Sequence, residues 1–396
     1  MEYKYKLSDG TWGKEEIIAI SEAITSDKFT MWNRVKAFEK AFADFFGSKY
    51  AVMVNSGSSA NLVLISALLY SGKLNKGDEV IVPAVSWSTT YFPITQNGLK
   101  IKFLDIDKDT LNIDTSQLEN AISNDTKAIF AVNLLGNPNN FDILLRTCKK
   151  YNLLLLEDNC EALGAKYNNK YTGTFGVGGT FSFFYSHHIC TMEGGTVLTD
   201  DKTLYEYMLS LRAHGWTRNL SKDSVIYQKN PDEFYELFNF ILPGYNLRPL
   251  EIEAAIGIEQ LKKVDKIIEN RRKNAEYFKE RLVDMRIYNT QTEVGESSWF
   301  GFPIILKEKY QGYKDLIIYF LKERGIEVRP IVAGNFLRNP VKKYIDYQLF
   351  GDLKNSDYIH DNGFFVGNHS IVDYDGINYL MDNLEEITKQ IIYSKM

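Results

Sequence analysis

The chain has 396 residues, with 46 basic against 51 acidic side chains and a formal net charge of -5. Such mild acidity argues against nucleic acid or an anionic membrane as the main partner, so any phosphate-bearing ligand must be bound by a local cluster of donors. The length predicts two domains.

The cysteine count and the apolar runs indicate the compartment. Cys148, Cys160 and Cys190 are too few and too scattered for a disulfide framework or a zinc site, so no metal is expected. Residues Met1–Lys6 contain no apolar signal core. The longest apolar runs, such as Leu153–Leu156, are far shorter than a membrane span. We therefore predict a cytoplasmic protein with neither a membrane nor a nucleic-acid partner.

Short apolar runs alternate with segments of helical period, which is the pattern of a parallel sheet covered by helices on both faces. The sequence thus predicts an α/β fold whose large domain holds a mostly parallel, seven-stranded sheet between helices. The predicted strands are Tyr50–Val54, Glu79–Val82, Lys102–Leu104, Ala128–Asn133, Leu153–Glu157, Gly179–Phe184 and Thr196–Thr199.

The C-terminal part has a different pattern. A long amphipathic helix is predicted between Gly257 and Leu282, because apolar residues recur there at helical spacing. Strands near Phe302–Leu306 and Ile326–Val328 follow, with helices near Tyr313–Arg324 and Val372–Tyr393. We predict a large α/β domain at residues 1–258, and a linking helix with a smaller α+β domain at residues 259–396.

The first candidate site element is the segment Asn55–Asn61, in which small and hydroxylic residues follow a predicted strand and precede a helix. Backbone N–H groups at a helix start, helped by the helix dipole and nearby hydroxyls, bind phosphate groups. Gly57 and Ser58 are the candidate ligands. The alternative is simple helix capping by Ser56 or Ser58.

Two further strand ends carry candidate ligands. Asp158 follows the apolar run Leu153–Leu156, and a carboxylate buried there is costly unless a cation meets it. Asp158 is thus a candidate partner for a protonated ring nitrogen, or otherwise a cap for the next turn. Trp87 follows the strand near Glu79–Val82 and could stack on a heteroaromatic ring, although a single tryptophan is more often a core residue.

The order and spacing of these elements resemble a known enzyme family. The resemblance runs from about Thr30 to the C-terminal end, to the pyridoxal phosphate (PLP) enzymes of nucleotide-sugar modification, a branch of the aspartate aminotransferase, or fold type I, superfamily. In that family a lysine five residues after the serine of a Ser-Phe motif forms a Schiff base with PLP. Here that position is His187, and no lysine occurs between Lys170 and Lys202. The matching motifs are Asn55–Asn61, Glu157–Asp158, Ser182–Phe183 with Glu193–Gly195, and Gly244–Arg248 before Ala254–Gly257.

The pair His187–His188 followed by Glu193–Gly195 is similar to the subgroup of 4-keto-6-deoxysugar 3-dehydratases. The resemblance implies that PLP, or its amine form pyridoxamine phosphate (PMP), is held without a covalent link. It also implies a homodimer with shared active sites. The implied cofactor-binding residues are Gly57, Ser58 and Ser182 at the phosphate, Trp87 on the ring, Asp158 at the ring nitrogen, Glu161 at the ring hydroxyl, and Asn246 at the phosphate of the neighbouring subunit.

His187 is the implied catalytic residue. A neutral imidazole takes and returns a proton near pH 7, whereas a lysine would also attack the cofactor and complete an ordinary transamination. The resemblance implies a dehydratase that uses glutamate as amino donor, removes the C3 hydroxyl of a nucleotide-linked 4-keto-6-deoxy sugar and releases ammonia, in dideoxysugar biosynthesis for surface polysaccharide. Because no cysteine follows Cys190, the iron-sulfur cluster of some relatives is not expected.

Five residues are candidates for substrate binding: His188, Arg329, Arg338, Trp32 and Tyr185. The arginines offer planar forks of donors for a substrate oxygen or a carboxylate, or they lie in a solvated surface loop. Trp32 and Tyr185 are candidate nucleotide contacts. His188 could orient His187, contact the sugar or simply pack.

Two other interpretations stay open beside the dehydratase. A nucleotide-sugar 4-aminotransferase of the same family would need another lysine at the cofactor, with Lys166 and Lys170 the nearest in sequence. An inactive homologue would bind the cofactor without turnover, or bind none and serve as a binding or scaffold protein.

Overall fold

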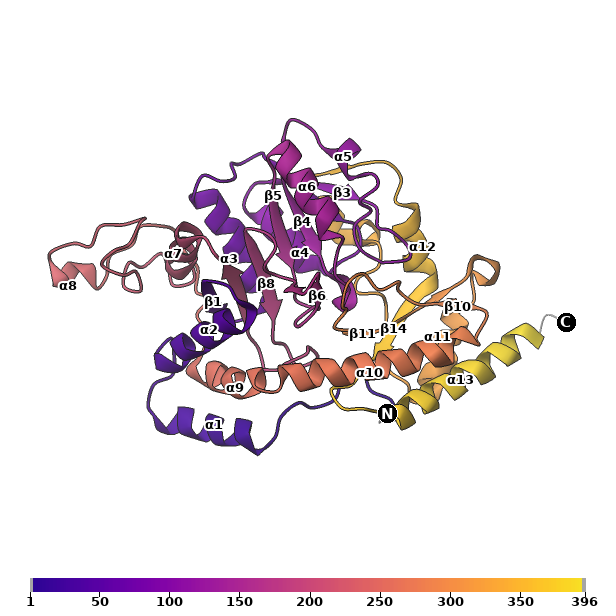
Figure 1. Ribbon diagram of the computed structural model, residues 1–396. Helices are drawn as coiled ribbons and strands as arrows, with labels where there is room; N and C mark the ends of the chain where they lie inside the picture. The colour runs from indigo at the N-terminus through magenta and orange to yellow at the C-terminus, as the bar shows by residue number, and fades with distance from the viewer. Residues whose placement is uncertain (1–2, 394–396) are drawn as a thin grey trace.

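A central mixed sheet organises the molecule, which Figure 1 shows as a computed structural model describing residues 3–393. Its strands are β1 (Tyr50–Val54), β2 (Glu79–Pro83), β3 (Lys100–Leu104), β4 (Thr126–Val132), β5 (Leu154–Asp158), β8 (Gly178–Ser182), β9 (Gly195–Thr199) and β13 (Tyr347–Leu349). They are ordered β1-β9-β8-β5-β4-β2-β3-β13. β9 is antiparallel to both of its neighbours, and the other strands run parallel to one another.

Both faces of the sheet are apolar because helices cover both. Along β1, Val52 and Val54 enter one core layer while Ala51 and Met53 enter the other, as the alternation of side chains along a strand requires. The first layer contains α3 (Gly57–Tyr70), α4 (Ser88–Gln96) and α7 (Lys202–Leu211). The second contains α2 (Asn33–Phe46), α5 (Leu118–Ala121), α6 (Phe141–Tyr151) and α9 (Glu251–Leu261), with α1 (Lys14–Thr25) packed on α9.

The predicted mostly parallel sheet between helices is confirmed, but the predicted number of strands is one too few. The additional strand, β13, pairs in parallel with β3 at the sheet edge. Its residues, Tyr347–Leu349, are half-buried or exposed and lack the apolar run that marks the inner strands. A short edge strand of this kind gives little signal in the sequence.

The single helix predicted between Gly257 and Leu282 is also wrong, because two helices occupy this stretch. α9 ends at Leu261 and α10 (Val264–Val283) begins after Lys263. The Lys263 ammonium lies 2.7 Å from Glu16 Oε1 of α1. The break therefore falls where the chain is anchored to α1, a contact that helical periodicity does not record.

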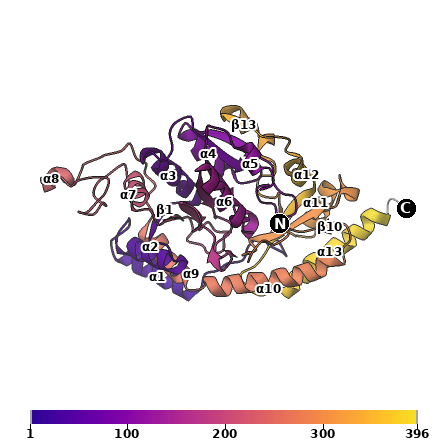
Figure 2. The same ribbon diagram turned by 45° about the horizontal axis from the view of Figure 1, so that its top comes forward.

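A second, antiparallel sheet with its own core lies beyond α10, which spans the two parts in both views (Figures 1 and 2). Its strands are β10 (Tyr288–Asn289), β11 (Gly301–Leu306), β12 (Val328–Arg329) and β14 (Gly363–Gly367), and its helices are α11 (Lys314–Glu323), α12 (Lys354–Asn362) and α13 (Tyr374–Tyr393). The N-terminal segment joins this core, since Tyr5 is buried in it and donates to the Gly367 carbonyl at 2.8 Å.

The domain boundary between residues 258 and 259 stays a prediction. Tyr5 and β13 each lie with the part of the fold assigned to the other side of that boundary. Residues 1–2 and 394–396 of the two predicted domains lie outside the described residues.

The segment between α7 and α9 forms an arm that projects from the body at the left of Figures 1 and 2 and contains α8 (Glu233–Glu236). Its aromatic side chains are largely exposed: 75% for Phe234, 67% for Tyr235, 64% for Phe238 and 51% for Phe240. Within residues 3–393, no helix is both long and apolar enough to cross a membrane.

A buried ion pair joins β2 and β3, near the β13 edge of the sheet. Lys102 of β3 lies 2.6 Å from Glu79 of β2, and both side chains are buried. We expect Glu79→Ala to lower the free energy of unfolding by about 3–5 kcal/mol, because the Lys102 charge is left buried and unpaired. Urea unfolding followed by circular dichroism measures the change. Glu308→Ala is the matched control, since it removes the exposed pair with Lys108 and should cost less than about 1 kcal/mol. Equal losses in the two variants would contradict the assignment.

Candidate active site

The carboxyl ends of the parallel strands meet at one edge of the sheet, the edge at which open α/β sheets bind ligands. β1 leads into Gly57, β2 leads into Trp87, β5 ends at Asp158 and β8 ends at Ser182. Gly195 begins the antiparallel β9 and pairs with the last residue of both β1 and β8. The topology therefore gathers residues from four strand ends that are far apart in the sequence.

Gly57 and Ser182 are in close approach. A Cβ atom added to Gly57 would lie 2.5 Å from the Cβ and 2.9 Å from the Oγ of Ser182, and 3.1 Å from the Cys160 Sγ. Only glycine lets the first turn of α3 come this near to β8. The positive end of α3 and a serine hydroxyl thus meet at one point, which is the arrangement that binds a phosphate.

Helix capping, the alternative for this segment, is present as well. Ser56 Oγ accepts a hydrogen bond from the Ser59 backbone N–H at 3.1 Å, and Ser59 Oγ donates to Asn55 Oδ1 at 2.6 Å. Ser58 is exposed at the same turn. Capping by Ser56 fixes the start of α3 and leaves the Ser58 hydroxyl outside this network.

Asp158 is a buried carboxylate held by neutral donors. Its Oδ2 accepts hydrogen bonds from Asn61 Nδ2 at 2.9 Å and from Thr90 Oγ1 at 2.7 Å. Its Oδ1 accepts from the Cys160 N–H at 3.2 Å, which is the predicted turn cap. Within residues 3–393, no lysine, arginine or histidine forms an ion pair with it. A buried negative charge without a counter-charge fits a cationic ring nitrogen.

Trp87 begins the helix whose Thr90 binds this carboxylate, and it is not a core residue. Its side chain is 58% exposed, and it occupies the N-cap position of α4. The Thr90 N–H donates to the Trp87 carbonyl at 3.1 Å, so the turn that carries the indole also delivers the Thr90 hydroxyl to Asp158.

Glu161 lies one turn after Asp158, where its Oε2 accepts from the Leu135 N–H at 2.9 Å. Burial raises the pKa of the Glu161 carboxyl to about 7, and the negative charge of Asp158 adds to the rise, while the Leu135 N–H opposes it. The carboxyl therefore changes its protonation state near neutral pH, as a side chain that shares a proton with a ligand hydroxyl would.

His187 sits in the turn after β8 at partial exposure. Its backbone N–H donates to the Phe184 carbonyl at 2.8 Å, and its ring lies edge-on to Phe300 with centroids 5.2 Å apart. Nδ1 is buried without a hydrogen-bond partner. Burial lowers the pKa of His187 to about 4. The Phe184 backbone opposes this fall in pKa, and the positive charge of Arg271 adds to it. The ring is therefore neutral at pH 7.

His188 is fully buried and also packs against Phe300, with ring centroids 5.7 Å apart. Its Nε2 lies 3.2 Å from the Ser298 carbonyl. Burial, then the Arg271 charge, hold its pKa well below the usual range. A side chain without exposed surface does not reach a ligand, so the structure argues against substrate contact by His188 and for support of its neighbour.

Three other predicted residues lie outside this cluster in the single subunit. The Trp32 ring is 51% exposed and faces the Lys28 ammonium, with 5.4 Å between that nitrogen and the ring centroid. Tyr185 is 56% exposed. Asn246 is exposed and its Oδ1 accepts from Arg248 Nε at 2.9 Å.

Both predicted arginines are engaged in ion pairs. Arg329 lies 2.7 Å from Glu327. Arg338 binds Asp361 through both terminal nitrogens and Asp357 through Nε. Each is a partly exposed surface side chain, which corresponds to the solvated-loop alternative in this conformation.

Neither lysine of the aminotransferase alternative contacts the cluster. Lys166 of β6 (Lys166–Tyr167) places its ammonium 4.6 Å from the centroid of Tyr171, and Lys170 of β7 (Lys170–Tyr171) lies 4.7 Å from that of Phe175. Tyr171 packs on α2 and Phe175 on α6. Among residues 3–393, no group of three His, Cys, Asp or Glu side chains is arranged to hold a metal ion.

Several residues of the cluster were not predicted from the sequence. Asn61 and Thr90 lie inside motifs that were singled out, and their amide and hydroxyl groups could have been matched to the nearby carboxylate. Arg271 and Phe300 had no such signal, because they are about 80 or more residues from His187 in the chain and only packing brings them together.

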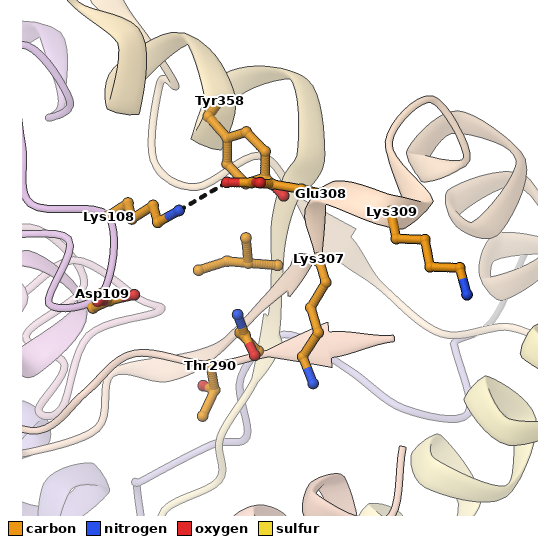
Figure 3. A pocket seen from close by; sticks show the side chains of 9 residues that line it. Lys108, Asp109, Thr290, Lys307, Glu308, Lys309 and Tyr358 are labelled. Atoms are coloured by element: carbon orange, nitrogen blue, oxygen red, sulfur yellow. Dashed lines mark hydrogen bonds and ion pairs between the residues drawn. The ribbon is translucent and has the colours of Figure 1, made fainter. Parts of the chain in front are cut away.

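A separate hollow of about 440 Å³ lies between the loop after β3 and the strands β10 and β11 of the second sheet (Figure 3). It shares no residue with the cluster. Lys108 and Asp109 line one wall, and Lys307, Glu308 and Tyr358 line the other. The Lys108–Glu308 ion pair of 3.1 Å crosses it. The hollow is therefore distinct from the site at the strand ends.

The chain belongs to the DegT/DnrJ/EryC1/StrS aminotransferase family, whose model matches residues 11–385. The family and the site together define an enzyme of the aminotransferase fold, as predicted. The chain is 54% identical over 385 residues to GDP-4-keto-6-deoxy-D-mannose 3-dehydratase of Escherichia coli O55:H7, covering 96% of this chain and 99% of the relative.

Solved structures give the same picture of the fold. The chain superposes with a TM-score of 0.95 on E. coli GDP-4-keto-6-deoxy-D-mannose-3-dehydratase with bound hydrated PLP, at 53% identity over 97% of this chain and 100% of that one. It also matches GDP-4-keto-6-deoxymannose-3-dehydratase with a trapped PLP-glutamate geminal diamine, with a TM-score of 0.94, 54% identity and coverage of 96% and 100%. The predicted fold type is confirmed.

The raised pKa of Glu161 makes stability depend on pH. The folded carboxyl holds its proton up to about pH 7, whereas the unfolded one releases it near its ordinary pKa of 4.5. Between these values the folded state binds more protons, so this group makes stability fall as pH rises. We expect Glu161→Gln to match the wild type at pH 4.5 and to exceed it at pH 8 by up to about 3 kcal/mol. Urea midpoints at both pH values measure this, and a difference independent of pH would contradict it.

Proposed function

We propose that this protein is a PLP- and PMP-dependent 3-dehydratase that removes the C3 hydroxyl of a nucleotide-linked 4-keto-6-deoxy sugar, with GDP-4-keto-6-deoxymannose as the first substrate to test. One observation carries the proposal: a neutral imidazole, His187, follows the strand whose end forms the phosphate cradle, in the place where family members have a nucleophilic lysine. The 54% identity over 385 residues to a GDP-4-keto-6-deoxy-D-mannose 3-dehydratase supports the same conclusion.

The residues present fit the cofactor at its phosphate and at its ring nitrogen. A Cβ atom at Gly57 would collide with Ser182, so the glycine keeps a cradle open at the start of α3. Asp158 is buried with hydrogen-bond donors but no cation. Gly57, Ser58 and Ser182 would hold the phosphate and Asp158 the ring nitrogen.

Trp87 would cover the ring face and Glu161 would meet the ring hydroxyl. When bound, the amine form of the cofactor supplies an amino group that condenses with the sugar ketone and a ring that accepts electrons.

His187 would move the proton. Because Nδ1 is buried, we assign the transfer to Nε2. The partial burial that lowers its pKa keeps the ring neutral, and a neutral ring accepts a proton without first losing one. An imidazole at this place does not form a Schiff base, so a bound cofactor would be held without a covalent link to the chain.

The overall reaction balances with glutamate as the reductant. Glutamate is oxidised to its 2-oxo acid and gives two electrons, the C3–O bond of the sugar is replaced by a C3–H bond, and the glutamate nitrogen leaves as ammonia. The product is a 3,6-dideoxy-4-keto sugar, which we assign to the synthesis of surface polysaccharide.

We base the proposed substrate contacts on which side chains are exposed to solvent. Trp32 and Tyr185 would contact the nucleotide, since both rings are more than half exposed. Arg329 and Arg338 would bind substrate oxygens after exchanging their present carboxylate partners. We assign His188 to the support of His187.

We further propose a homodimer with shared active sites. The arm exposes four aromatic side chains between Phe234 and Phe240, and a second copy of the chain would bury them. Asn246, which lies in the same segment closer to α9, would then reach the cofactor phosphate of the neighbouring subunit. The three free cysteines suit a reducing cytoplasm.

The proposed role of His187 can be tested by substitution. His187→Asn should retain cofactor binding and lose at least about 100-fold in kcat, because the proton acceptor is removed. The assay incubates the protein with PLP, glutamate and GDP-4-keto-6-deoxymannose, or the same sugar on other nucleoside diphosphates, and identifies a 3-deoxy product by mass.

His188→Asn is the matched comparison and should lose less turnover than His187→Asn, because His188 supports the base without moving the proton itself. A wild-type protein that yields no 3-deoxy product with any of these sugars, while binding PLP, would refute the dehydratase in favour of an inactive homologue. A protein that binds no PLP would support the scaffold alternative. Covalent trapping of PLP by borohydride, located at Lys166 or Lys170, would support the 4-aminotransferase.

Mixing two variants tests whether the active site is shared between subunits. His187→Asn and Asn246→Ala variants should each be weakly active, and a mixture that exchanges subunits should recover activity, because one mixed site then has both residues intact. Sedimentation confirms the dimer in each sample. A mixture no more active than the sum of its parts would contradict a site built from two subunits.

A further inference from the structure

A buried arginine lies behind the two histidines. Arg271 is in α10, which runs along the underside of the molecule between its two parts (Figures 1 and 2). Its side chain is 1% exposed and forms no ion pair within the described chain. Nη1 donates to the carbonyl oxygens of Trp299 at 3.4 Å and Phe300 at 3.0 Å, and Nε has no partner.

These carbonyls belong to a short strained segment. Trp299 has a φ of 48°, an unusual conformation for a bulky residue that the surroundings must enforce. Asn368 Nδ2 donates to the Trp299 carbonyl at 2.8 Å. On the other side, the Phe300 N–H donates to the Leu135 carbonyl at 3.1 Å. The segment is thus fixed from α10, from the end of β14 and from the turn after β4.

The same segment carries the contacts to both histidines. The Phe300 ring lies against His187 and His188, with centroid distances of 5.2 and 5.7 Å. The Ser298 carbonyl lies 3.2 Å from His188 Nε2. A shift of the Trp299–Phe300 backbone would therefore move the packing surface of both rings.

The charges around the histidines come from few elements. The charge of Arg271, in α10, acts on both histidines, and His187 acts on His188. Asp9 and Tyr5, from the N-terminal segment, act on Arg271 itself. Burial lowers the pKa of Arg271 to about 10, so the group stays charged at neutral pH, and its charge lowers the pKa of both histidines.

We propose that Arg271 is a positioning residue for His187: its charged guanidinium holds the Trp299–Phe300 segment against the imidazole, so that the ring stays fixed. The inference rests on the proposed role of His187. A buried cation without a carboxylate is expensive, and two backbone carbonyls alone could be satisfied by a neutral donor.

The test compares neutral and charged replacements on the full-length protein. Arg271→Gln and Arg271→Met remove the charge, and Arg271→Lys retains it. Asn368→Ala is the matched control, because it removes a hydrogen bond to the same Trp299 carbonyl without changing any charge. The ring of His187 is followed by NMR in protein labelled with 13C-histidine, and the His187→Asn variant assigns its signal among the five histidines.

We expect the titration midpoint of His187 to rise by about one pH unit in the neutral variants and to stay at the wild-type value in Arg271→Lys and Asn368→Ala. Asn368→Ala should lower thermal stability without moving this midpoint. An unchanged midpoint in the neutral variants would overturn the proposal, and so would an equal rise in Asn368→Ala, which would trace the effect to lost packing. If neither neutral variant folds, Arg271→Lys decides, since a raised midpoint there would also overturn it.

Turnover gives a second readout. Arg271→Lys should lower kcat roughly tenfold or more with KM unchanged, because lysine cannot bind both carbonyls and the base is displaced. A rise in KM with kcat unchanged would contradict the positioning role of Arg271. A wild-type protein without dehydratase activity would refute the proposed function and leave the titration result standing, so the two failures are distinguishable.

Discussion

The buried carboxylate of Asp158 is the constraint on which the site depends. It ends the central strand β5 with no cation beside it in the described chain, and its two oxygens take hydrogen bonds from Asn61 of α3, Thr90 of α4 and the Cys160 N–H. Each donor fixes a different element relative to the sheet. The phosphate cradle at the start of α3 and the indole at the start of α4 are therefore placed by the same group that would meet the ring nitrogen.

The chemistry also depends on an imidazole base that stands where related enzymes have a nucleophilic lysine amine. A lysine buried at this turn would be stabilised by forming a covalent bond to the cofactor, and the site would favour amino transfer. His187 forms no such bond and is kept neutral by partial burial and the charge of Arg271. Cofactor and base are then separate groups, which is the condition for eliminating a hydroxyl from a bound sugar.

Contacts between distant segments support both features. The N-terminal segment reaches the second core through Tyr5, and Trp12 Nε1 donates to the Cys190 carbonyl at 2.9 Å, just beyond the histidine pair. Gln260 Oε1 accepts from the Cys190 N–H at 3.1 Å. The segment just after His187 is thus held by the N-terminal segment and by α9. Such anchoring suits a base that must keep a fixed distance from a cofactor held without a covalent bond.

The sequence by itself determined the features that depend on neighbouring residues. Apolar runs of strand length marked the inner strands, because strands buried on both faces need them, and the residues at their ends marked Gly57, Trp87 and Asp158 as candidate ligands. Ser182 and His187 were singled out by the resemblance of their motif to the family's Schiff-base segment. Only the tertiary structure decided what depends on packing between distant segments: the eighth strand β13, the break between α9 and α10, the complete burial of His188, and the approach of Phe300 and Arg271 to the histidines. The physical reason is that periodicity and motifs record the environment of a residue along the chain, whereas a contact across more than 80 residues exists only after the two cores have formed.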